Sequence, residues 1–213
     1  HLVAQIAHEP HQGDKQGDAA HGKDDIAETA YLEKDGAQFV VVNFERMIGR
    51  AIPKADLSQW AVCIALDGGV REGKNNTQIV LVHDKKNTCM DNFTPSDYDK
   101  DLNSKAFTDD KLGEFAITSV EVGDMVSKDE YIENVLKTIL QHDEVKRVMI
   151  VPDSEKSGAY SQIRSLLRNT DDDNKRITMF AMQPLEGGNF RQEILGYSLM
   201  NALGIRSDEI NGK

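Results

Sequence analysis

The chain has 213 residues, of which 39% are hydrophobic and 6% aromatic, and its formal net charge is −11. This length suits one folded domain with or without a tail, and the acidic balance argues against a broad basic surface for nucleic acid. No apolar run approaches the ~20 residues that span a bilayer, and Cys63 and Cys89 provide no disulfide framework. We therefore expect a soluble, cytoplasmic protein.

Residues 1–36 differ in composition from the rest of the chain. They hold four of the six histidines, and eight acidic residues against three lysines. Such a segment can bury little apolar surface, so we expect a flexible or loosely docked arm. The sequence His8-Glu9-Pro10-His11 contains metal-ligand residue types, but no second ligand pair follows at a known spacing. We therefore assign no metal site to this arm.

Five short apolar runs, each bounded by turn residues, predict buried parallel strands. The third run alternates apolar and polar residues, which is typical of an edge strand. The runs cover residues 39–42, 77–82, 115–120, 148–151 and 177–182.

Helical patterns lie between these runs, and most begin at a residue suited to cap a helix. Asp56 with Gln59 and Ser127 with Glu130 have the spacing of a capping box. Pro95 suits the first position of a helix that runs to about residue 103. The expected helix starts are Asn43, Asp56, Thr94, Ser127, Ser157 and Asn189.

The alternation of strands and helices favours βαβ units with right-handed crossovers. We predict a single Rossmann-like α/β domain over residues 37–213, three-layered and doubly wound. Its sheet is expected to have five mostly parallel strands in the order 3-2-1-4-5, with helices on both faces. Ligands of such sheets bind beyond the carboxyl ends of the strands, where the strand order reverses.

Polar residues follow the predicted strand ends. Asn43 follows the first strand, Asp84 the second, and Asp153, Ser154 and Glu155 the fourth. Carboxylates that meet at one edge can hold Mg²⁺ or Mn²⁺, which activates water against phosphodiesters. Asp153 and Glu155 are therefore candidate catalytic residues, and Asp84 and Asp153 are candidate metal ligands. The ordinary alternative is that these acids form turns or solvated loops.

Other residues near the strand ends suggest binding. Gly188 and Asn189 before a helix could cradle a phosphate with free N–H groups, and Arg191 would add a charge. Asn43 and Ser154 complete the candidate ligand-binding residues, although a Gly-Gly pair is more often a plain connection. His83 could act as a general base, but no nucleophile is linked to it by sequence.

The segment Val148-Met-Ile-Val-Pro-Asp153-Ser154-Glu155, with the helix of Tyr160 behind it, resembles the fourth-strand segment of the PIN/NYN-like nucleases. The resemblance implies a divalent metal between an acid on the first strand and an acid after the fourth. Asn43 stands in place of the first acid, and the start of the last helix carries no acid. The stretch Asn189-Phe-Arg-Gln-Glu-Ile-Leu-Gly-Tyr197 is also similar to one in a family of gut Bacteroides proteins, which supplies no function.

Two functions of different class follow. The missing acids favour a binding or interaction module with a degenerate acidic rim, which acts on a protein partner, a second copy or a small ligand. The alternative is a metal-dependent ribonuclease that hydrolyses RNA phosphodiesters with Mg²⁺ or Mn²⁺. A nucleotide-binding protein that uses the Gly187-Gly188 turn ranks third, and no membrane partner is expected.

Overall fold

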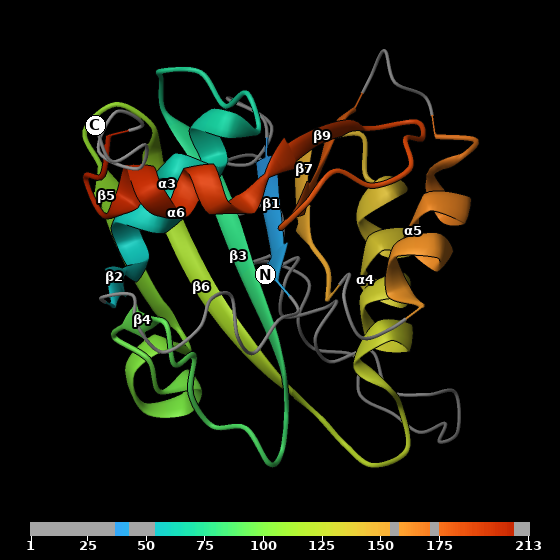
Figure 1. Ribbon diagram of the computed structural model, residues 1–213, viewed down its shortest axis with the longest axis horizontal. Helices are drawn as coiled ribbons and strands as arrows, with labels where there is room; N and C mark the ends of the chain where they lie inside the picture. Colours follow the sequence, from blue (N-terminus) through green and yellow to red (C-terminus); the bar gives the residue numbers. More distant parts are fainter. Residues whose placement is uncertain (1–36, 43–53, 154–157, 171–174, 207–213) are drawn as a thin grey trace, which may run out of the picture.

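The computed structural model describes residues 37–42, 54–153, 158–170 and 175–206 (Figure 1). The predicted arm over residues 1–36 lies outside these ranges. So do the candidate site residues Asn43, Ser154 and Glu155, and the expected helix start Ser157.

The described residues form one seven-stranded sheet and one two-stranded sheet. In the larger sheet the order is β5-β6-β3-β1-β7-β8-β9, and only the edge strand β5 runs antiparallel to its neighbour. The smaller sheet pairs β2 (Ala55–Asp56) with β4 (Phe93–Thr94). The strands of the larger sheet are β1 (Ala37–Val42), β3 (Asn75–Asp84), β5 (Lys105–Asp109), β6 (Gly113–Val122), β7 (Val145–Val151), β8 (Arg176–Ala181) and β9 (Arg191–Ile194).

The prediction of a single five-stranded parallel sheet was therefore wrong. Both additional strands of the large sheet are edge strands, and edge strands lack the continuous apolar run used to recognise the buried ones. β5 pairs with β6 along its whole length, and the Phe107 ring stacks on Phe115 of β6 with centroids 4.8 Å apart. β9 has the sequence Arg-Gln-Glu-Ile and pairs with β8 through its backbone.

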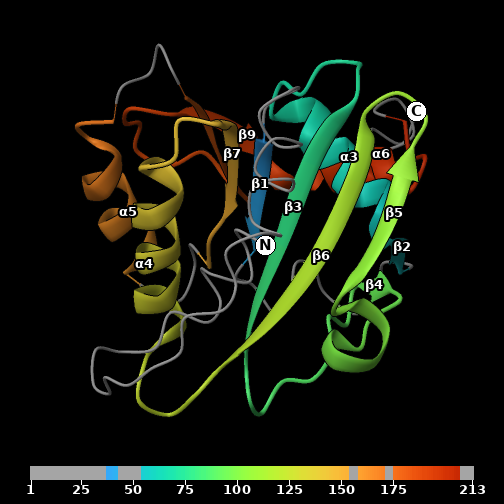
Figure 2. The same cartoon turned by 180° about the vertical axis from the view of Figure 1, so that it is seen from behind.

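Two pairs of helices cover opposite faces of the sheet, as Figures 1 and 2 show. On one face lie α3 (Leu57–Asp67) and α6 (Leu195–Ala202), over a core that includes Trp60, Phe93 and Phe180. On the other lie α4 (Lys128–Leu140) and α5 (Ala159–Leu167), over a core of mainly aliphatic residues. Within the described residues no helix is both long and apolar enough to cross a membrane.

Local capping signals predicted two helix starts correctly and misplaced two others. The Asp56 side chain accepts a hydrogen bond from the Gln59 amide at 2.9 Å, and Ser127 accepts one from Glu130 at 3.2 Å. The Thr94–Pro95 bond is cis, and the short helical turn η1 (Tyr98–Leu102) begins only after Asp97. The last helix begins at Leu195 rather than at Asn189, because residues 191–194 pair as β9.

Candidate functional site

The carboxyl edge of the sheet is stepped. β1 ends at Val42, which pairs with Leu81 of β3 and Val151 of β7. β3 and β6 remain paired beyond that level, up to Asp84 and Val122. His83 and Asp84 therefore stand beyond the end of β1, at the carboxyl edge of the sheet. The strands β3 and β6 end at the bottom of Figure 1. This is the edge at which parallel α/β sheets bind their ligands.

His83 is a buried polar residue at this edge, with 2% of its surface exposed. Strand alternation places it on the face of Ile79 and Leu81, which pack under α3 and α6. Its ring stacks on that of Tyr98, with centroids 4.1 Å apart and planes within 1° of parallel. The Nδ1 atom lies 3.0 Å from the carbonyl oxygen of Asn87 and 3.1 Å from that of Asp84.

These two contacts define which ring nitrogen of His83 carries the proton. A carbonyl oxygen only accepts hydrogen bonds, so Nδ1 must be protonated and must donate. In the neutral ring Nε2 is then a lone-pair acceptor. That atom is buried and has no hydrogen-bond partner among the described residues. A histidine whose Nδ1–H is held by a backbone carbonyl presents its other nitrogen in a fixed direction, as bases and metal ligands do.

Asp84 follows His83 and points to the opposite face of the sheet. Its carboxylate lies 2.9 Å from Nζ of Lys128, in the first turn of α4. The Lys128 side chain is 17% exposed, whereas that of Asp84 is 47% exposed. The helix start at Ser127 thus places a cation against the acid that was predicted to bind a metal, and this cation offsets the charge of Asp84.

Asp153 lies two residues beyond β7 and is partly buried. β1 separates β7 from β3, and since neighbouring strands lie ~4.8 Å apart, the Asp153 and Asp84 backbones belong to positions roughly 10 Å apart across the sheet. Among the described residues no group of three or more His, Cys, Asp or Glu side chains could hold a metal ion. The structure does not bring Asp84 and Asp153 into such a group.

The residues expected to cradle a phosphate serve the connection between β8 and β9. The Asn189 side-chain amide donates to the Leu167 carbonyl at 3.1 Å and to the Thr170 carbonyl at 2.6 Å, both at the end of α5. Gly188 forms a bridge with Phe190, and Arg191 forms an ion pair with Glu193 at 2.7 Å. None of Gly188, Asn189 and Arg191 lies at the start of a described helix, so the helix-start reasoning behind their prediction does not apply.

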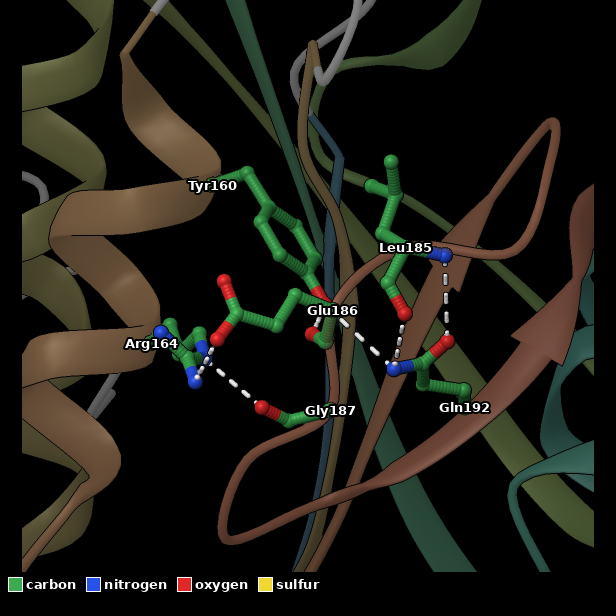
Figure 3. Close-up of polar contacts among 6 residues, drawn as sticks. All are labelled: Tyr160, Arg164, Leu185, Glu186, Gly187 and Gln192. Carbon is green, nitrogen blue, oxygen red and sulfur yellow. Dashed lines mark hydrogen bonds and ion pairs between the residues drawn. The ribbon is translucent and has the colours of Figure 1, made fainter.

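Figure 3 shows how side chains of α5 and β9 hold the same connection. Tyr160 donates its hydroxyl proton to the Glu186 carbonyl, and burial raises the pKa of this phenol. Arg164 donates to the Gly187 carbonyl at 2.6 Å and to the Glu186 carboxylate at 2.7 Å. The Gln192 amide donates to the Leu185 carbonyl at 2.9 Å and accepts from the Leu185 N–H at 3.3 Å. The polar side-chain groups of Tyr160, Arg164 and Gln192 therefore hold the β8–β9 connection in place.

Sequence reasoning considered His83 but missed both residues that define its edge of the sheet, Tyr98 and Lys128. The end-of-strand position of His83 was readable from the apolar run before it. The stacking of Tyr98 and the approach of Lys128 to Asp84 depend on tertiary packing, and no local pattern signals either.

The comparisons with known proteins give a family without an assigned activity. No curated protein and no solved structure matches the chain. Because the model of a family of unknown function matches residues 26–210, the chain belongs to that family, DUF6621.

Proposed function

We propose that the protein is a ligand-binding module whose site lies at the carboxyl edge of the sheet, around His83. The observation that carries this proposal is the buried, oriented and unpartnered Nε2 atom of that residue. A buried acceptor without a partner costs about 1–3 kcal/mol, so a molecule that donates a hydrogen bond there would recover part of this cost on binding.

The chemistry of the edge indicates the kind of ligand. Nε2 of the neutral ring accepts a hydrogen bond, so the ligand carries an N–H or O–H donor such as an amide, a hydroxyl or a protonated ring nitrogen. The stacked Tyr98 ring covers one face of His83, and the lone pair of Nε2 lies in the plane of the ring, so the donor must approach Nε2 in that plane. We infer a small polar ligand rather than an extended polyanion, because Nε2 presents a hydrogen-bond acceptor and an anion carries acceptors of its own.

Two other functions stay predictions. The ribonuclease alternative depends on Asp84, Asp153 and Glu155. Glu155 lies outside the described residues, and Asp84 is paired with Lys128. Cleavage of RNA with Mn²⁺ or Mg²⁺ that Asp153→Asn abolishes would support it. A protein partner or a second copy would appear as a stable complex in size-exclusion chromatography with light scattering.

The experiment is a thermal-shift screen of small hydrogen-bond donors against three proteins: wild type, His83→Asn and His83→Gln. Asn keeps a donor near the position of Nδ1 but removes the group at Nε2. Gln reaches the position of Nε2 and retains an acceptor there. A ligand at a hundred times its dissociation constant stabilises the folded state by about 2.7 kcal/mol.

We expect compounds that raise the melting temperature of the wild type to lose their effect on His83→Asn and to keep part of it on His83→Gln. Urea unfolding of both unliganded variants controls for the fold. Compounds that shift the wild type and a folded His83→Asn equally would refute a site at Nε2, and a broad donor library without any hit would refute the ligand-binding proposal.

A further inference from the structure

Three arginines gather at the amino edge of the sheet, opposite the His83 site. Arg147 in β7 and Arg176 at the start of β8 are register partners on neighbouring parallel strands. Since such strands lie ~4.8 Å apart, partner side chains leave the sheet side by side. Side chains two positions apart on a strand lie on the same face of the sheet. Arg147 therefore lies on the face of Met149 and Val151, and Arg176 on the face of Phe180, which is the face covered by α3 and α6.

Arg71 joins them from the loop that follows α3. It interacts electrostatically with Arg147, as Arg176 does, and the repulsion from both adds to the desolvation that lowers the pKa of Arg147. We call Arg71, Arg147 and Arg176 the arginine cluster. It concentrates positive charge at one point of a chain whose net charge is −11.

Acidic side chains do not neutralise this cluster within the described residues. No acid forms an ion pair with any of the three guanidinium groups there. The two acids nearest to Arg71 along the chain have other partners: Glu72 pairs with Lys111 at 3.6 Å, and Asp67 accepts the hydroxyl proton of Ser198.

Arg147 also carries a buried donor without an acceptor. Its Nε atom is excluded from solvent and has no hydrogen-bond partner among the described residues. An N–H group in this state loses its hydration without compensation, which costs more for a charged group than for a neutral one. One anion with several oxygen atoms could neutralise the neighbouring guanidinium groups and also accept the hydrogen bond of Arg147 Nε.

We propose that the arginine cluster binds the phosphate group of a small molecule. Guanidinium groups present paired N–H donors that match the oxygens of a phosphate, and a phosphate monoester carries close to two negative charges at neutral pH. A single carboxylate would neutralise only one of the three cations. This site lies at the opposite edge of the sheet from His83 and does not depend on the function proposed there.

The test is a calorimetric titration of the protein with inorganic phosphate, with acetate as the single-carboxylate comparison. Arg176 is exposed, so Arg176→Gln removes one guanidinium while leaving the core intact. Arg147→Lys keeps the charge and removes the fork. Lys105→Gln, on the exposed strand β5, removes the same charge elsewhere and serves as the matched control.

We expect saturable phosphate binding by the wild type and by Lys105→Gln, weakened about tenfold or more in Arg176→Gln and Arg147→Lys. Each of these two variants loses charge-assisted hydrogen bonds to the anion, and tenfold weaker binding corresponds to about 1.4 kcal/mol. Three results would overturn the proposal: no saturable phosphate binding, equal weakening by Lys105→Gln, or acetate binding as tightly as phosphate.

Discussion

Gly68 provides the sharpest test of how α3 packs on the sheet. A Cβ atom at this position would lie 2.7 Å from Sδ of Met149 and closer still to its Cγ atom. Carbon and sulfur atoms that are not bonded need about 3.5–4.0 Å, so Gly68→Ala forces Met149 or the end of α3 to move. Met149 is fully buried in the core under α3 and α6, which leaves it little room. Overpacking of this kind costs about 1–3 kcal/mol.

Gly196 in α6 is the matched control. A Cβ atom there meets nothing within 4 Å, and alanine is the better helix former. Gly196→Ala should therefore raise the free energy of unfolding by about 0.5–1 kcal/mol. Urea unfolding of both variants measures the difference. Equal effects of the two substitutions, or a Gly68→Ala protein as stable as the wild type, would show that α3 does not approach Met149 as described.

Three further substitutions test single polar groups. Tyr131→Phe removes a buried hydroxyl that has no partner among the described residues, so we expect about 1 kcal/mol of added stability in urea unfolding. Burial raises the Tyr131 pKa to about 12 from 10.0, so the wild type should lose stability relative to this variant as the pH rises from 10 to 12. An advantage of the variant that shrinks over this range would contradict the buried phenol. Ser198→Ala removes the hydroxyl that donates to the Asp67 carboxylate and links α6 to α3, which should cost about 1.5–3 kcal/mol, against little change for the exposed Ser161→Ala. Lys175→Met removes the ammonium that donates to the carbonyls of His142 and Val145, and the melting temperature should fall as two acceptors lose their donor.

Local signals predicted those parts of the fold that depend on local contacts. Asp56 and Ser127 cap their helices through bonds to residues only three positions away, so short spacings reveal them. Asn189 has the same capping-box spacing to Gln192, but its side-chain amide instead donates to carbonyls at the end of α5, 19 to 22 residues earlier in the chain. β5 and β9 were missed because pairing at the edge of a sheet requires little apolar sequence.

The candidate sites likewise combine features that local sequence predicts with features that depend on tertiary packing. The position of His83 at the end of a strand follows from the apolar run before it, whereas its burial against Tyr98 requires the fold of the intervening loop. Arg147 lies in β7 just before the apolar run that was predicted as a strand. Its approach to Arg176 and Arg71 depends on strand register and on where α3 ends, neither of which local patterns encode.

A long-range ¹H–¹⁵N correlation spectrum of the histidine side chains, assigned through His83→Asn, measures directly which ring nitrogen of His83 carries the proton. For the neutral form of His83 we expect the proton on Nδ1 and an Nε2 shift typical of an unprotonated nitrogen, which moves when a ligand donates to it. A proton on Nε2 in the neutral ring would contradict the carbonyl contacts of Nδ1 and remove the acceptor on which the proposed function depends.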